Sequence, residues 1–203
     1  MRASSEPQSA TLSSQEPNLL AAAKGSCPIY LNIFKSTDNG ATWSGTSGLA
    51  GNVVHSFAIK DASVWATFAA LPNESGIARS TDNGNTWQVV PSIITNAGES
   101  IVSDNAIIVA EDNFIWRSTN DGMSWDVVEQ FALTGISSFA KAGTKLFGAA
   151  TTGIQTSTDN GASWSFEAFS NGAYSFSSNG STIYLASNSK VFKSTDVGRL
   201  GSM

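Results

Sequence analysis

The stretch Ser36-Thr37-Asp38-Asn39-Gly40-Ala41-Thr42-Trp43 decides the fold of this chain, because the sequence repeats it. Three further copies end at Trp87, Trp125 and Trp164, and a fifth copy begins at Ser194 before the pattern is lost. The four tryptophans lie 44, 38 and 39 residues apart. Self-similarity at a fixed period of about 40 residues indicates a repeat architecture, in which each repeat is one supersecondary unit.

Each copy has the chemistry of a tight turn between two strands. Its glycine accepts positive φ, while the Asx and Ser/Thr side chains can hydrogen-bond the backbone of their own turn. The closing tryptophan begins the next strand and supplies a large apolar surface. We expect a structural role for these residues, because a catalytic site needs one convergent set and not one copy per repeat. The structural set is Asp38, Gly40, Trp43, Asp82, Gly84, Trp87, Asn120, Gly122, Trp125, Asp159, Gly161, Trp164, Asp196 and Gly198.

The pattern S-x-D-x-G-x-[ST]-W resembles the Asp-box of bacterial neuraminidase (BNR, sialidase-type) repeats, over residues 36–198. Two copies depart from it: Asn120 replaces the aspartate in the third, and Leu200 and Gly201 replace the hydroxyl and tryptophan in the fifth. The resemblance implies a β-propeller in which each box joins the third and fourth strands of a blade. It implies no single activity, since sialidases, xyloglucanases, sortilin-like receptors and photosystem assembly factors all carry Asp-boxes. It suggests an extracellular or periplasmic location, although the first residues lack the apolar core of a signal peptide.

Between the copies, short alternating segments separated by polar turns predict four strands per unit. We therefore expect an all-β fold, a propeller of four-stranded antiparallel blades, with five blades of which the first and last are irregular. The expected units are residues 18–49, 50–91, 97–130, 134–169 and 172–203 of a domain at 18–203. Residues 1–17 form either a flexible tail or, through Ala10 to Ser14, the closing strand of the last blade. Within the first unit, Asn18 to Ala23 are expected as the first strand and Ile29 to Leu31 as the second, which makes that unit about four residues short.

The composition excludes several classes of partner. The chain has 203 residues, a net charge of −5 and only 13% charged residues, without a cluster of Lys or Arg. Nucleic acid and anionic membrane surfaces both need a cationic footprint. No apolar run approaches the ~18–20 residues of a membrane span. With one cysteine, Cys27, and one histidine, His55, no Cys/His cluster suggests zinc, and no Gly-rich loop suggests phosphate binding, so no metal and no cofactor are expected.

The candidate ligand site lies on the face opposite the boxes. Turns between second and third strands lie there, together with the entrances of the first strands. Aligning the first strands of the repeats places four different side chains in one equivalent row: His55, Glu99, Ser137 and Tyr174. Glu111 and Asp112 belong to a turn on the same face. Loops on a rigid scaffold are where binding residues concentrate, so these six residues are the predicted ligand-binding set.

Three functions remain open. The first is a non-catalytic propeller that binds a glycan or a protein on this face. The second is a glycoside hydrolase that uses an acidic pair, Glu99 with Glu111 or Asp112. The third is a propeller fragment, or a shortened or engineered propeller, with a structural role and self-association through its sheet edges. A sialidase is disfavoured, because Arg79 and Arg117 occupy a repeated strand position where we expect solvated side chains.

Overall fold

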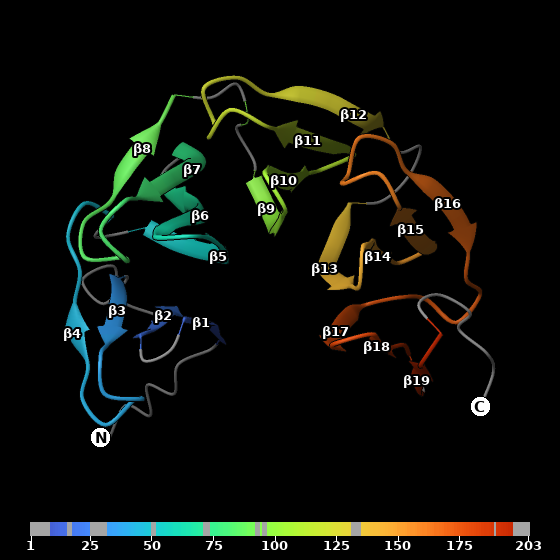
Figure 1. Cartoon of the computed structure of the whole chain (residues 1–203), viewed down its shortest axis with the longest axis horizontal. Coiled ribbons are helices and arrows are strands. Elements are labelled where there is room, and N and C mark those ends of the chain that lie inside the picture. The colour runs from blue at the N-terminus through green and yellow to red at the C-terminus, as the bar shows by residue number, and fades with distance from the viewer. Residues whose placement is uncertain are drawn as a thin grey trace, which may run out of the picture. The chain divides into compact units, whose positions relative to one another are not determined.

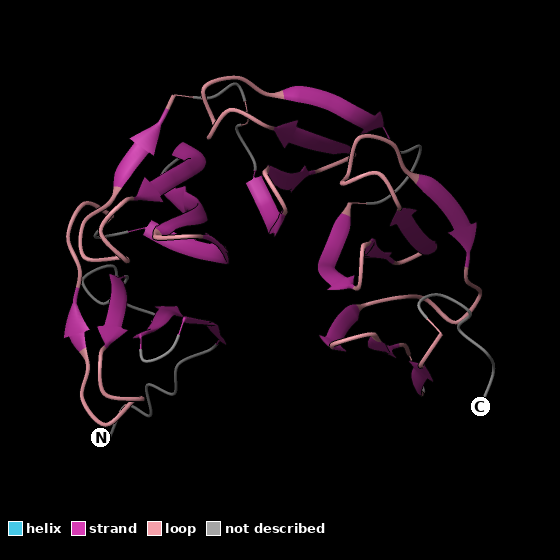
Figure 2. Cartoon of the chain, viewed as in Figure 1, coloured by secondary structure: helices cyan, strands magenta, loops and turns pink. Residues whose placement is uncertain are grey.

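The computed structural model describes residues 9–15, 18–24, 32–49, 52–70, 74–91, 94, 97–130, 135–188 and 190–196. Within these ranges all regular elements are β-strands, and none is a helix (Figures 1 and 2). The strands form five antiparallel sheets in which consecutive strands are neighbours. These sheets are the blades of a five-bladed β-propeller, as the repeats predict. The described residues contain no helix that could cross a membrane.

Residues 1–97 form the first of two compact units and contain two sheets. The first sheet consists of β1 (Ser9–Gln15), β2 (Asn18–Lys24), β3 (Asn32–Ser36) and β4 (Ser44–Gly45). The second sheet consists of β5 (Asn52–Lys60), β6 (Ser63–Ala70), β7 (Glu74–Ser80) and β8 (Gln88–Val90). The first strands of the two sheets, β1 and β5, lie against each other.

Residues 98–203 form the second unit, with three sheets. The third sheet contains β9 (Ala97–Ser103), β10 (Ala106–Glu111), β11 (Phe114–Ser118) and β12 (Asp126–Gln130). The fourth contains β13 (Ile136–Ala142), β14 (Lys145–Ala150), β15 (Gly153–Ser157) and β16 (Ser165–Ala168). The fifth contains β17 (Ser175–Asn179), β18 (Thr182–Ala186) and β19 (Val191–Ser194). Here too the first strands of neighbouring sheets, β13 and β17, lie against each other.

The irregular first and last blades are confirmed. The fourth strand of the first sheet, β4, has only two residues, and the fifth sheet has three strands among the described residues.

The strand assignment predicted for the first repeat, residues 18–49, is wrong, however. β1 pairs with β2 along its whole length, from Ser9 opposite Lys24 to Gln15 opposite Asn18. Asn18 to Ala23 therefore belong to the second strand, and Ala10 to Ser14 belong to the first sheet and not to the last. The first repeat was predicted to be about four residues short because Asn18 to Ala23 were counted as its first strand, so that prediction is wrong as well. β1 is mostly polar, so its weak apolar alternation does not show from sequence which sheet it joins.

The core lies between consecutive sheets within each unit. Leu20 and Ile33 of the first sheet pack with Val64 and Trp87 of the second. An equivalent cluster joins the third and fourth sheets, and another joins the fourth and fifth. Each fully buried Leu or Ile contributes roughly 1.5–3 kcal/mol to stability. The fourth sheet, in the middle of the second unit, is therefore apolar on both faces, which explains why Leu146 to Ala150 of β14 are all buried.

All five sheets share one register between their second and third strands. A large apolar residue on the second strand lies opposite the residue that precedes the turn serine. These pairs are Leu20–Lys35, Trp65–Arg79, Ile108–Arg117, Phe147–Thr156 and Tyr184–Lys193. In the first, third and fourth sheets the apolar member belongs to the core shared with the next sheet.

Candidate functional site

The repeated turns are closed by side chains of their own residues. In the first copy, Ser36 Oγ donates to Asp38 Oδ1 at 2.7 Å and accepts the Gly40 amide at 2.8 Å. The Asp38 carboxylate also accepts the amide of Thr42 at 2.8 Å and its hydroxyl at 2.6 Å. Gly40 has φ of 89°, the positive value that the motif predicts, and Asn39 before it also has a positive φ of 56°. The copies that begin at Ser80 and Ser157 repeat these contacts.

The third copy keeps the same turn with an amide in place of the carboxylate. Asn120 Oδ1 accepts the Ser118 hydroxyl at 3.0 Å and the Ser124 amide at 2.9 Å. Asn120 Nδ2 donates to Ser124 Oγ at 2.8 Å, so this hydroxyl accepts where its counterparts donate. In the fifth copy Ser194 Oγ donates to Asp196 Oδ1 at 2.7 Å, while Gly198 lies outside the described residues.

Hydrogen bonds keep the turn aspartates ionised. Bonds from the hydroxyl and amide of Thr42 and from Ser36 lower the pKa of Asp38 to about 2. The Ser163 hydroxyl and amide lower the pKa of Asp159 to about 2 in the same way. For Asp82, burial acts to raise the pKa, but bonds from Thr86 and Ser80 outweigh it and bring the value to about 2. General acid catalysis needs a pKa near the working pH, so these carboxylates are suited to structure and not to proton transfer.

The turn tryptophans do not share one environment. Trp87 and Trp164 are 4% and 8% exposed, and each packs on a first-strand phenylalanine, with ring centroids 6.0 Å from Phe57 and 5.8 Å from Phe139 respectively. Trp43 is 41% exposed. Its indole NH still donates to the Gly40 carbonyl at 3.1 Å. The first copy therefore forms its turn without burying its indole, a difference that the sequence does not reveal.

Turns also dock onto the preceding sheet within each unit. A Cβ built on Gly84 would lie 2.6 Å from Leu20 Cδ2, so the second turn presses on β2. Lys35 is buried and donates from Nζ to Asn85 Oδ1 at 3.0 Å. In the second unit Gly161 presses on Ile108 in the same way.

The arginines at this strand position are half-buried and hydrogen-bonded, whereas solvated side chains were expected. Arg117 Nε donates to the Asn160 carbonyl of the next sheet at 3.0 Å. Arg79 lies over the Trp65 ring, 5.0 Å from its centroid, and donates to Ser63 Oγ at 3.1 Å. Stacking and hydrogen bonding are the uses to which a guanidinium is best suited. These side chains therefore belong to the scaffold.

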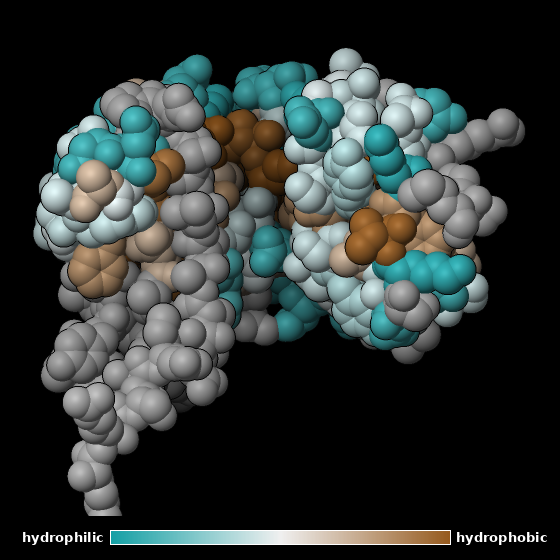
Figure 3. Space-filling model, turned by 90° about the horizontal axis from the view of Figure 1, so that it is seen from below, coloured by the Kyte–Doolittle hydropathy of each residue, from teal (hydrophilic) through white to brown (hydrophobic). Residues whose placement is uncertain are grey.

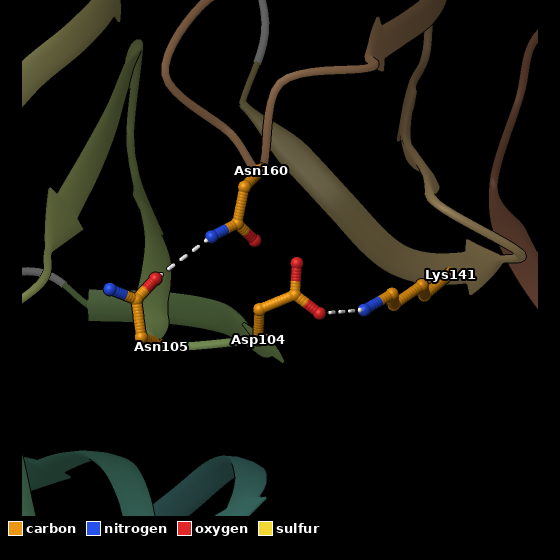
Figure 4. Close-up of polar contacts among 4 residues, drawn as sticks. All are labelled: Asp104, Asn105, Lys141 and Asn160. Carbon is orange, nitrogen blue, oxygen red and sulfur yellow. Dashed lines mark hydrogen bonds and ion pairs between the residues drawn. The ribbon is translucent and has the colours of Figure 1, made fainter.

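Figure 4 shows polar contacts between the third and fourth sheets. Asn160 Nδ2 donates to Asn105 Oδ1 at 3.1 Å, and Lys141 Nζ lies 3.0 Å from Asp104 Oδ1. Asp104 and Asn105 form the turn between β9 and β10, the first and second strands of the third sheet. This turn therefore lies beside the repeated turn of the fourth sheet, which contains Asn160. The turns between second and third strands are at the other ends of those strands, on the face predicted for ligand binding.

Two members of the predicted row share a backbone irregularity. In β5, Val54 pairs with Phe68 and Ser56 with Thr67, which leaves His55 as the extra residue of a β-bulge. In β13 the register shifts between Ile136 and Ser138, which makes Ser137 the extra residue there. Both side chains are exposed. Bulges re-aim side chains and are common beside functional sites.

Ser137 and Tyr174 are brought together by the structure. Ser137 Oγ donates to the Tyr174 carbonyl at 2.7 Å, and the Tyr174 hydroxyl donates to Asn188 Oδ1 at 2.7 Å. Asn188 follows β18 in a second–third turn and is not among the predicted site residues. A polar cluster of Ser137, Tyr174 and Asn188 thus spans the fourth and fifth sheets. The sequence places Asn188 in one of the second–third turns of this face, but only the structure shows its contact with Tyr174.

The acidic candidates lie in the third sheet with different environments. Glu111 is 7% exposed, and its Oε2 accepts the indole NH of Trp116 at 2.7 Å. Asp112 is exposed and adopts φ of 43° in the following turn. Glu99 is half-buried on the neighbouring strand β9. Glu111 therefore anchors an aromatic ring, while Asp112 faces solvent. Five of the six predicted residues belong to the second unit and His55 to the first.

No protein-family model and no curated protein sequence matches the chain. Among solved structures it is similar to YCF48 bound to D1 peptide, at 13% identity and a TM-score of 0.67, covering 94% of this chain and 63% of that one. It is similar to the extracellular domain of BT4673 from B. thetaiotaomicron at 12% identity and a TM-score of 0.69, covering 91% and 27%. It is also similar to a nidogen/laminin complex, at 12% identity and a TM-score of 0.66, covering 91% of this chain and 73% of that one. The chain thus spans less than two thirds of the YCF48 chain. At such identities the likeness shows the fold alone, and that fold is a β-propeller.

Proposed function

We propose that the chain is a non-catalytic propeller of the Asp-box type that binds an extended peptide of a protein partner. The binding surface is the face opposite the repeated turns. The observation that carries the proposal lies in the second unit, where a bulge in β13 exposes Ser137, whose hydroxyl donates to the Tyr174 carbonyl. The closed Ser–Asp–Gly–Thr turns support the Asp-box assignment.

The chemistry of the cluster formed by Ser137, Tyr174 and Asn188 suits a peptide. Tyr174 is 41% exposed and combines an aromatic face with a hydroxyl held by Asn188. Binding sites of this kind orient a ligand with a few placed polar groups and supply contact area with aromatic rings. The exposed carboxylate of Asp112 adds a negative charge that favours a Lys or Arg side chain in the peptide.

Two of the similar structures support a protein ligand. One is a YCF48 bound to a peptide and another is a nidogen/laminin complex. A glycan remains the alternative ligand, because aromatic and amide side chains also bind sugars.

A hydrolase with an acidic pair is less well supported. Its mechanism needs two carboxylates that face one sugar across roughly 5–10 Å. The Glu111 carboxylate is buried and holds the Trp116 indole, which gives it a structural task.

The test is a peptide array and a glycan array probed with the full chain and three variants. We expect peptide ligands whose affinity falls more than about tenfold in Tyr174→Ala, as for an aromatic anchor. His55→Ala shows whether the first unit takes part. Gln88→Ala, on the exposed β8, is the matched control and should bind normally. Glycan binding that Tyr174→Ala removes, or peptide binding that no variant changes, contradicts the peptide proposal.

A further inference from the structure

The chain contains five Asn-Gly pairs, and the structure holds the glycine amide in four of them. An asparagine that precedes glycine in a flexible chain readily loses its side-chain amide, because glycine has no Cβ to hinder attack by its own nitrogen. Such asparagines are among the thermolabile residues of proteins. The pairs begin at Asn39, Asn83, Asn160, Asn171 and Asn179.

Three of the pairs lie in the repeated turns, where the glycine amide donates to the hydroxyl of the serine that begins the turn. Gly84 and Gly161 are also buried. The serine therefore gives the proton of each of these three nitrogens a fixed acceptor. The N–O distances are 2.8 Å for Gly40 with Ser36, 2.8 Å for Gly84 with Ser80, and 2.9 Å for Gly161 with Ser157.

The fourth pair is held by a backbone contact. The amide of Gly172 donates to the Phe169 carbonyl at 3.0 Å. Gly172 is buried, and a Cβ built on it would lie 3.2 Å from Asn188 Nδ2 and 3.3 Å from the Thr151 carbonyl oxygen. A ring that joined the Asn171 side chain to this nitrogen would therefore have little room to form.

The fifth pair has neither form of protection. Asn179 ends β17 opposite Thr182 of β18, so Gly180 and Ser181 form a two-residue turn, and the three residues 179–181 are exposed. The Gly180 amide donates no hydrogen bond to any residue that the structure describes. A Cβ built on Gly180 would meet nothing within 4 Å. Hydrophilic and near-neutral residues make up most of the described surface in the view of Figure 3, which is the usual setting of a turn of Asn, Gly and Ser.

We propose that Asn179 is a site of spontaneous deamidation, and that the serine of each repeated turn protects the asparagine of that turn from the same reaction. The Gly180 nitrogen gives its proton to water or hydroxide and attacks the side-chain carbonyl carbon of Asn179. The new N–C bond closes a five-membered succinimide, while the bond to the side-chain nitrogen breaks and ammonia leaves. Water then opens the ring at either carbonyl and gives aspartate or isoaspartate, so the reaction consumes one water for each ammonia released.

The protection by serine follows from the first step. The attacking nitrogen must lose its proton, and a hydrogen bond from that N–H to an oxygen favours the protonated form. The bond also fixes the backbone of the turn, whereas ring closure requires rotation about the ψ angle of the asparagine. Each of these bonds lies within one turn, so the difference between Asn179 and the other four asparagines is local.

The products change the end of β17. Both add a negative charge, which acts on the neighbouring groups like any other charge-changing modification. Isoaspartate also lengthens the backbone by one carbon between Asn179 and Gly180. The length of a hairpin loop fixes the register of its strands, so the pairing of β17 with β18 should weaken as the protein ages.

Incubation of the full chain in mildly alkaline buffer, followed by digestion at acidic pH and tandem mass spectrometry, measures the reaction at each asparagine. In the folded chain we expect Asn179 to react more than about tenfold faster than the other four, because their glycine nitrogens must first give up a hydrogen bond. In denaturing guanidinium chloride the five rates should become similar. Reaction at Asn179 no faster than at Asn171 in the folded chain, or an equal preference for Asn179 in denaturant, overturns the proposal.

Variants of one repeated turn test the role of the serine. Ser157→Ala removes the acceptor of the Gly161 amide and should speed the reaction at Asn160 more than about tenfold, with the rate at Asn179 unchanged. Ser157→Thr keeps a hydroxyl and should leave Asn160 protected.

The rate at Asn171 in the same sample reports whether the second unit is still folded. If Ser157→Ala speeds the reaction at Asn171 as well, the unit has opened, and Ser36→Ala read at Asn39 then decides in the first unit. An unchanged rate beside the substituted serine in a folded alanine variant contradicts the protective role.

Discussion

Arg117 Nε donates a 3.0 Å hydrogen bond to the carbonyl of Asn160, which lies 43 residues later in the chain. The bond ties the third strand of one sheet to the repeated turn of the next. Lys35 and Asn85 make the corresponding contact in the first unit, 50 residues apart, through a different atom of the turn. Because both cations directly precede a turn serine, one position of the repeat connects neighbouring sheets.

Arg117→Leu should lower the free energy of unfolding by about 1–2 kcal/mol. The substitution removes a hydrogen bond to a charged donor and leaves the Asn160 carbonyl without that partner, which costs this much in partly buried sites. Urea denaturation followed by tryptophan fluorescence measures the change. Lys190→Leu, at an exposed position, is the control and should change stability by less than about 0.5 kcal/mol. Equal effects of the two substitutions would show that the contact is not stabilising.

Gly84→Ala should destabilise the protein more than Gly180→Ala. Both glycines have positive φ, 83° and 61°, so both substitutions carry backbone strain of about 1–3 kcal/mol. Only at Gly84 does the new Cβ also meet a side chain, Leu20 Cδ2 at 2.6 Å, whereas nothing lies within 4 Å at Gly180. A double-mutant cycle with Leu20→Ala should recover part of the loss, since the clash disappears. Strictly additive effects would contradict the contact.

The repeat made the fold predictable from sequence, and the prediction failed where the chain departs from the repeat. Four near-identical turns set the strand positions of the second to fourth sheets, because turn chemistry is local and acts within eight residues. The first strand, Ser9–Gln15, was offered only as a closing strand of the last blade, because its residues are mostly polar and only its pairing with Asn18–Lys24 shows which sheet it joins. Arg117 was misjudged for a related reason, since its partner Asn160 lies in another repeat.

The sequence predicted which positions line the candidate site, but not which of their side chains touch. Alignment of the repeats placed His55 and Ser137 in one row, and both turn out to be bulge residues. Which side chains meet depends on the packing of neighbouring sheets. The alignment placed Ser137 and Tyr174 next to each other in the row, but it could not show that they form a hydrogen bond. Asn188 was predicted only as part of a turn on this face, and its contact with the Tyr174 hydroxyl required the structure.

Acid should weaken the fold between about pH 4 and pH 2. The pKa of Asp38, Asp82 and Asp159 falls from 3.8 to about 2 in the folded chain, so the unfolded chain binds protons first as the pH drops. Their stabilisation is therefore complete above pH 4 and is lost as the pH falls through 2. Urea midpoints measured over this range should decrease. Asp159→Asn copies the amide found naturally at Asn120 and should make the decrease shallower. An unchanged slope would mean that this carboxylate contributes nothing to the acid response.

Glu111→Ala should cost about 1–3 kcal/mol of stability, because it leaves the indole NH of Trp116 without the acceptor now 2.7 Å away. Glu111→Gln keeps an oxygen acceptor at the same place and should be close to the parent chain. Urea denaturation of the two variants separates an anchoring role from one that needs the charge, since only the alanine variant loses the acceptor. If the two variants were equally destabilised, the negative charge of Glu111 and not its acceptor oxygen would be what the third sheet requires.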